Sequence, residues 1–184
     1  PHNRTITQKI QKMKKLMLTL ALACIAWTAN AQTQERVFQK IFNDAYKVAT
    51  DVKEDQNVRK VASFKVDAIT YLNTKTLEQL TDTTRQLTNA EVAHINAQLD
   101  SMAYFMYDYL NLYAKEYSRA KNEKAKARIL KLFRDVSINH PLYNDPDKEL
   151  VLAYFNREDY PTQFSLDTDW VAAVTAVKIR LKGN

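Results

Sequence analysis

The stretch TNAEVAHINAQLDSMAYFMYDYLNLYAKEYSRA, residues 88–120, decides the fold class of this chain. Its apolar side chains repeat at alternating spacings of three and four, in the series Val92, Ile95, Leu99, Met102, Met106, Tyr109 and Tyr113. Such spacing aligns an apolar seam along one side of a helix. Thr88 and Glu91 have the Thr-x-x-Glu spacing of a capping box, which begins a helix. Because the other faces of 102–113 are also largely apolar, we expect a long central helix over about 89–120.

Shorter helical patterns lie on both sides of this segment. Apolar spacing predicts five further helices, over about 34–55, 57–72, 122–138, 146–157 and 169–182. In the threonine-rich stretch 73–88, Leu77, Leu80 and Leu87 could form a short extra helix, although threonine has a low helix propensity. For the last helix we expect Asp167 or Thr168 at the N-cap. Its inward face is predicted to consist of Trp170, Val171, Val174 and Val177.

The glycine content excludes several classes of protein. Gly183 is the single glycine among 184 residues. Phosphate-binding loops and dinucleotide-binding motifs need several glycines at fixed positions, and tight β-hairpins also depend on glycine. We therefore expect an all-α fold, either a compact helical bundle or an irregular helical array of five to six helices. Residues 32–184 are predicted to form one domain, which is long enough to bury its own core.

Residues 1–31 differ from the rest of the chain in charge and hydropathy. They contain five basic residues and no acid. From Met13 the sequence reads Met-Lys-Lys, then a mainly apolar run of 12 residues, then Ala-Asn-Ala ending at Ala31. This order of parts resembles a secretory signal peptide. We expect residues 1–12 to be an upstream extension, translation to start at Met13 and cleavage to follow Ala31.

Export changes what the charge and the cysteine imply. Removing residues 1–31 leaves 22 basic and 21 acidic residues, so the net charge falls from +6 to +1 and we expect no nucleic-acid partner. Cys24 precedes Ile-Ala-Trp rather than polar residues, so we do not expect a lipoprotein anchor there. The apolar run is shorter than the about 20 residues that span a bilayer. We expect a periplasmic or secreted protein with no transmembrane span after cleavage and no cofactor.

One short segment gathers side chains of chemical interest. His140, Tyr143, Asp145 and Asp147 bring an imidazole, a phenol and two carboxylates within eight residues. A metal ion or a general base could use such a group. The same residues also fit a structural role, in which His140 ends one helix while Asp145 and Asp147 stabilise the first turn of the next.

Aromatic residues in or beside the expected loops are candidate ligand or partner contacts. Tyr143 and Tyr160 lie in these loops, and Trp170 lies close to the second one. Loops on a rigid scaffold often carry recognition. We therefore group these three residues with His140 and the two loop carboxylates as one candidate contact set.

A basic segment provides a second candidate surface. Between Lys121 and Arg134 there are six basic residues and one acid. An amphipathic basic helix can bind anionic lipid or another polyanion, and the candidate contacts are Lys124, Arg128 and Lys131. The alternative is a solvated helix face whose charge is balanced by the acidic residues of 145–169.

Taken together, these features favour binding over catalysis. The mature chain has no thiol and no Gly-x-Ser-x-Gly motif. We expect an exported, bacterial-type helical protein that is not an enzyme and that binds a protein, a glycan or a small ligand of the cell envelope. The alternative function is a small metal-assisted or carboxylate-dependent enzyme that uses the His140–Asp147 loop. Self-association through an exposed apolar patch is a third hypothesis, so the oligomeric state stays open.

Overall fold

The computed structural model describes residues 35–137 and 164–183. The chain divides into two compact units, Pro1–Glu35 and Arg36–Asn184, and the second unit contains all the helices of the described ranges. Its described helices are α2 (Val37–Thr50), α3 (Gln56–Leu80), α4 (Asn89–Arg119), α5 (Glu123–Arg134) and α7 (Trp170–Lys182). No strand occurs in these two ranges, and the predicted all-α class is confirmed.

Helix α4 begins and packs as its sequence predicts. The Thr88 backbone N–H donates to Glu91 Oε2 over 2.8 Å, and the Glu91 backbone N–H donates to Thr88 Oγ1 over 3.2 Å, which completes the capping box. The apolar seam is buried from Ile95 to Tyr113. This burial confirms α4 as the long central helix of the fold.

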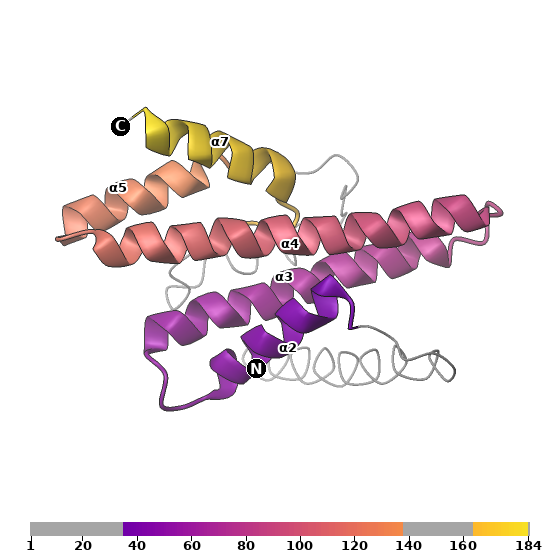
Figure 1. The fold of residues 1–184 in the computed structure, drawn as a ribbon, viewed down its shortest axis with the longest axis horizontal. Coiled ribbons are helices and arrows are strands. Elements are labelled where there is room, and N and C mark those ends of the chain that lie inside the picture. The colour runs from indigo at the N-terminus through magenta and orange to yellow at the C-terminus, as the bar shows by residue number, and fades with distance from the viewer. Residues whose placement is uncertain (1–34, 138–163, 184) are drawn as a thin grey trace, which may run out of the picture. The chain divides into compact units, whose positions relative to one another are not determined.

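The other helices contact α4 in two groups (Figure 1). Helices α2 and α3 pack against each other and against α4, while α5 and α7 pack against each other and against α4. In the view of Figure 1 the first group lies below α4 and the second above it. Because α4 has neighbours in both groups, most of its circumference is used for packing, as expected from its apolar composition.

An aromatic cluster fills the core where α4 meets α5 and α7. The Tyr109 ring lies 5.2 Å from the ring of Phe133 and 5.5 Å from the rings of Phe164 and Trp170, all edge to face. The Tyr109 hydroxyl donates to the Phe133 carbonyl, and burial raises the pKa of this phenol. The Trp170 ring also lies 6.2 Å from that of Phe64 on α3. These rings are fully buried, so they join both helix groups into one core.

Hydrogen bonds connect the end of α5 with the segment that precedes α7. The Thr168 hydroxyl donates to the Ser165 carbonyl over 2.7 Å and therefore accepts from the Ser137 hydroxyl, 2.6 Å away. The Ser165 hydroxyl donates to the buried carboxylate of Asp167. The start of α7 is thereby fixed beside the end of α5.

Three sequence-based helix boundaries differ from the structure. Helix α5 ends at Arg134, with Asp135 as its C-cap, rather than at about 138. Helix α2 ends at Thr50 rather than at about 55. Helix α3 continues to Leu80, although the threonine-rich sequence predicted an end at about 72. The hydroxyls of Thr74 and Thr76 donate to carbonyls four residues earlier, over 2.9 Å each, and Thr76 is buried in the domain. These bonds satisfy the hydroxyls inside the helix, and tertiary packing outweighs the low helix propensity of threonine.

The beginning of α7 also differs from the prediction. Its N-cap is Asp169, whose Oδ1 accepts from the Ala172 backbone N–H over 3.0 Å, rather than Asp167 or Thr168. Val171 is exposed and does not face inward. Trp170, in contrast, faces inward as expected.

Candidate functional site

Helix α5 presents one apolar side to the core and one basic side to solvent. Asn122 begins the helix, since its side-chain oxygen accepts from the Ala125 backbone N–H over 2.9 Å. Phe133 is fully buried, and the partly buried apolar residues that pack beside it are Ile129, Leu130 and Leu132. The apolar side of α5 is therefore occupied by the protein's own core.

The opposite side carries the three basic residues singled out in the sequence. Lys124, Arg128 and Lys131 follow each other at spacings of four and three, so they share one side of the helix, and all three are exposed. Lys131 donates to Asp135 over 2.6 Å. Lys124 and Arg128 have no hydrogen bond or ion pair within the described ranges.

Helix α7 extends this basic side. Arg180 is exposed and close enough to Asp135 of the α5 C-cap to contribute to lowering the pKa of that carboxyl, which the hydrogen bond from Lys131 lowers most. Lys182 is exposed as well, with no ion pair to a described residue. We define the cationic surface by its exposed members on and next to the two helices: Lys121, Lys124, Arg128, Lys131, Arg134, Arg180 and Lys182.

A surface hollow of about 500 Å³ lies on α5 within the cationic surface. The described residues that line it are Ala127, Leu130, Lys131, Arg134 and Asp135. Two cations and one carboxylate therefore meet at its edge.

The predicted loop contacts divide into two groups. His140, Tyr143, Asp145, Asp147 and Tyr160 lie outside the described residues. Trp170 is 0% exposed and belongs to the aromatic core. For Trp170 the structure thus corrects the expectation of an accessible contact. Trp170 follows a loop in the sequence, but it is the first residue of α7 and its side chain packs inward.

The described part of the chain contains neither a cluster of metal-ligating side chains nor a membrane-spanning helix. Residues 35–137 and 164–183 contain no group of three or more His, Cys, Asp or Glu side chains placed to hold a metal ion. Within the same ranges, none of the helices combines the length and the apolar character that crossing a bilayer requires.

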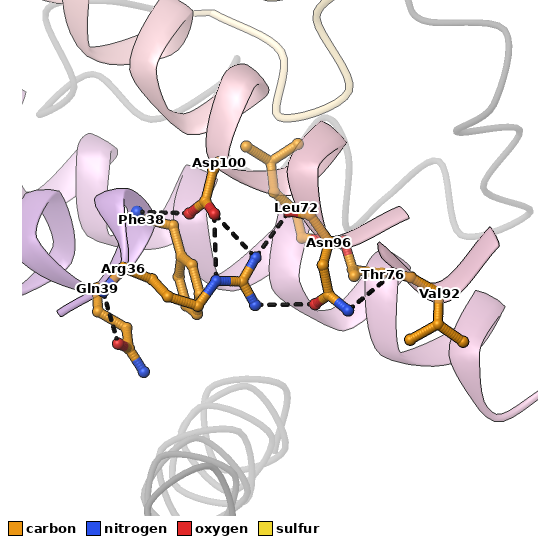
Figure 2. Close-up of polar contacts among 8 residues, drawn as sticks. All are labelled: Arg36, Phe38, Gln39, Leu72, Thr76, Val92, Asn96 and Asp100. Carbon is orange, nitrogen blue, oxygen red and sulfur yellow. Dashed lines mark hydrogen bonds and ion pairs between the residues drawn. The ribbon is translucent and has the colours of Figure 1, made fainter. Parts of the chain in front are cut away.

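A second polar cluster, which the sequence analysis missed, attaches the start of α2 to α4 (Figure 2). The Arg36 guanidinium donates to Asn96 Oδ1 over 2.8 Å, to the Asn96 carbonyl over 2.7 Å and to Asp100 Oδ2 over 3.0 Å. The other oxygen of Asp100 accepts from the Phe38 backbone N–H over 3.1 Å. Every polar group here is matched within the protein, which indicates a structural clamp rather than a ligand site.

Comparison with known proteins adds no relative. No protein-family model matches the chain, and no significantly similar curated protein or solved structure was found.

Proposed function

We propose that this protein is an exported, non-catalytic binding protein of the cell envelope, and that its cationic surface binds a polyanion. The polyanion would carry repeated phosphate, sulfate or carboxylate groups. The signal-like segment that ends at Ala31 supports export. A periplasmic or secreted location would bring the cationic surface into contact with envelope polymers and lipids.

The observation that carries this proposal is the set of unpaired cations on the α5 side of the surface. Lys121, Lys124 and Arg128 are exposed and make no ion pair or hydrogen bond in the described ranges. Lys131 on the same helix and Lys178 on α7, by contrast, are each paired with a carboxylate, at 2.6 Å in both cases. Unpaired cations on adjacent turns add their potentials and attract a polyanion over about one Debye length.

The packing of α5 favours a contact made by charge rather than by insertion. Its apolar side is used against α4 and the aromatic core, with Phe133 fully buried. A helix that inserts into lipid needs its apolar side free. The contact is therefore expected to depend strongly on salt and weakly on apolar surface.

Charge reversal tests the proposal. The triple variant Lys121→Glu/Lys124→Glu/Arg128→Glu changes the net charge by −6, and its matched control is Lys40→Glu/Lys47→Glu/Lys53→Glu, three exposed positions on and just after α2. Binding of each purified mature protein to dextran sulfate and to vesicles containing phosphatidylglycerol is measured at low salt. Circular dichroism verifies that each variant remains helical.

The expected result is that the wild type and the control bind at least one of the two probes and the α5 variant loses at least about tenfold in affinity. Binding to dextran sulfate alone would identify a soluble polyanion, and binding to vesicles alone a lipid surface. Equal loss in the control and in the α5 variant would contradict a localised site. No binding of the wild type to either probe would also contradict the proposal.

A further inference from the structure

Lys65 on α3 is a partly buried cation whose contacts with described residues are not with a carboxylate. Its Nζ donates to Asn111 Oδ1 on α4 over 2.6 Å and lies 4.8 Å from the centre of the Tyr107 ring. Both partners are electrically neutral. By contrast, Arg36 is paired with Asp100 at 3.0 Å and Lys75 with Glu78 at 2.9 Å.

The absence of a counter-charge has an energetic consequence. Burial lowers the pKa of Lys65 from its usual 10.5 to about 8, and no acidic side chain of residues 35–137 or 164–183 acts against this effect. A partly buried charge without a partner of opposite sign costs free energy, because water is removed and no ion pair replaces it. Such uncompensated groups occur preferentially at functional sites.

The local geometry leaves hydrogen-bond donors for an anion. The Lys65 ammonium has three N–H groups, of which one is directed to Asn111 Oδ1. The amide nitrogen of Asn111 is bonded to the same carbon as Oδ1, so its two N–H groups lie within a few ångströms of Nζ. They make no hydrogen bond in the described ranges. One carboxylate group has the size and the two acceptor oxygens to take a hydrogen bond from each residue.

An aromatic surface lies next to these donors. Tyr107 is 39% exposed and is the ring that Lys65 contacts. Tyr104, one turn earlier on α4, is 53% exposed. Exposed aromatic rings beside a charged group form a surface on which the flat or apolar part of an organic ligand can pack.

We propose that Lys65 and Asn111 bind the carboxylate of a small organic acid whose flat or apolar part packs on Tyr107 and Tyr104. This site is separate from the cationic surface and does not depend on the function proposed for it. The bound carboxylate supplies the counter-charge that Lys65 lacks. Affinity is therefore expected to fall as the pH rises through the pKa of Lys65, since the neutral amine loses the ionic attraction.

Nuclear magnetic resonance titration of the mature protein provides the test. The probes are benzoate, which has both the carboxylate and the ring, and benzamide, which has the ring without the charge. The variants are Lys65→Met, which removes the ammonium while keeping a similar shape, and Asn111→Asp, which places a carboxylate next to Lys65. The matched control is Lys60→Met on the same helix.

We expect saturable shifts of the Tyr104 and Tyr107 resonances with benzoate in the wild type and in the control. Benzamide is expected to bind at least about tenfold more weakly. Lys65→Met and Asn111→Asp should both lose benzoate binding, the second because its own carboxylate occupies Lys65. Thermal unfolding verifies that each variant is folded, and Lys65→Met should be at least as stable as the wild type.

Each of the following results would overturn this proposal. The first is benzoate binding that is equal in Lys65→Met and in the wild type. The second is equal binding of benzamide and benzoate. The third is the absence of any benzoate-induced shift in the wild type up to the solubility limit. Loss of benzoate binding in the α5 triple variant would instead assign the ligand to the cationic surface and would also contradict a separate site.

Discussion

Removal of the Arg36 side chain should destabilise the domain measurably. In the variant Arg36→Ala, the guanidinium contacts with Asn96 and Asp100, at 2.7 to 3.2 Å, are lost. Asp100 then retains its hydrogen bond from the Phe38 backbone N–H but has no cation. The start of α2 would be held on α4 by fewer contacts, so the loss should appear in global unfolding.

The exposure of the two charged side chains limits the size of the effect. The Arg36 and Asp100 side chains are 34% and 28% exposed, so solvent screens part of their attraction. A hydrogen bond to a charged group contributes about 1.5–3 kcal/mol when it is well buried, whereas a fully exposed pair contributes at most about 1 kcal/mol. For this intermediate case we expect a loss of about 2 kcal/mol in the free energy of unfolding. In a domain of this size, that loss lowers Tm by about 4–8 °C.

Urea unfolding followed by circular dichroism measures this loss. The matched control is Lys40→Ala, an exposed position on the same helix, where we expect a change within about 0.5 kcal/mol. A double-mutant cycle with Asp100→Ala should give a coupling energy of about 1–2 kcal/mol. If Arg36→Ala is as stable as Lys40→Ala, or if the coupling energy is zero, the clamp does not stabilise the fold.

Three further substitutions test the aromatic core, the start of α4 and the burial of Lys65. Trp170→Ala should cost about 3–5 kcal/mol in urea unfolding, because it leaves a cavity in the aromatic core; a cost below about 1 kcal/mol would contradict the core position of this ring. Thr88→Ala should cost about 1 kcal/mol through loss of the N-cap of α4, and a neutral effect would contradict the capping box. Lys65→Met should raise the free energy of unfolding by about 1–2 kcal/mol below pH 8. The substitution removes a cation whose pKa is 10.5 in the unfolded chain and about 8 in the folded protein. The unfolded wild type binds the proton more tightly, so wild-type stability should rise from about pH 8 to 10.5 relative to the variant, and parallel pH profiles would refute this.

The parts of the fold that depend on local sequence could be predicted. The apolar seam of α4 follows from the spacing of residues such as Leu99, Met102 and Met106, and its start from the Thr88–Glu91 pair. Helix periodicity and capping act within a few residues, so the sequence alone contains them. The continuation of α3 through Thr74 and Thr76 could not be predicted in this way, because it depends on packing rather than on local propensity.

Most of the features that could not be predicted from the sequence are contacts between residues far apart along the chain. Arg36 and Asp100 are 64 residues apart, and Lys65 and Asn111 are 46 apart. No local pattern relates such residues. Arg180 was missed as a member of the cationic surface for the same reason, since its position depends on the packing of α7 beside α5. The basic side of α5 itself was found, because Lys124 and Arg128 are neighbours on one helix.

The salt dependence of polyanion binding tests the central claim about the cationic surface most directly. Affinity for dextran sulfate is measured over a series of salt concentrations for the wild type and for Lys121→Glu/Lys124→Glu/Arg128→Glu. We expect the wild-type affinity to fall steeply with salt, so that a plot of log affinity against log salt has a negative slope. In the variant the magnitude of this slope should be smaller by about three, one for each cation that contacts the polymer. A wild-type affinity that does not change with salt, or an unchanged slope in the variant, would contradict binding through this surface.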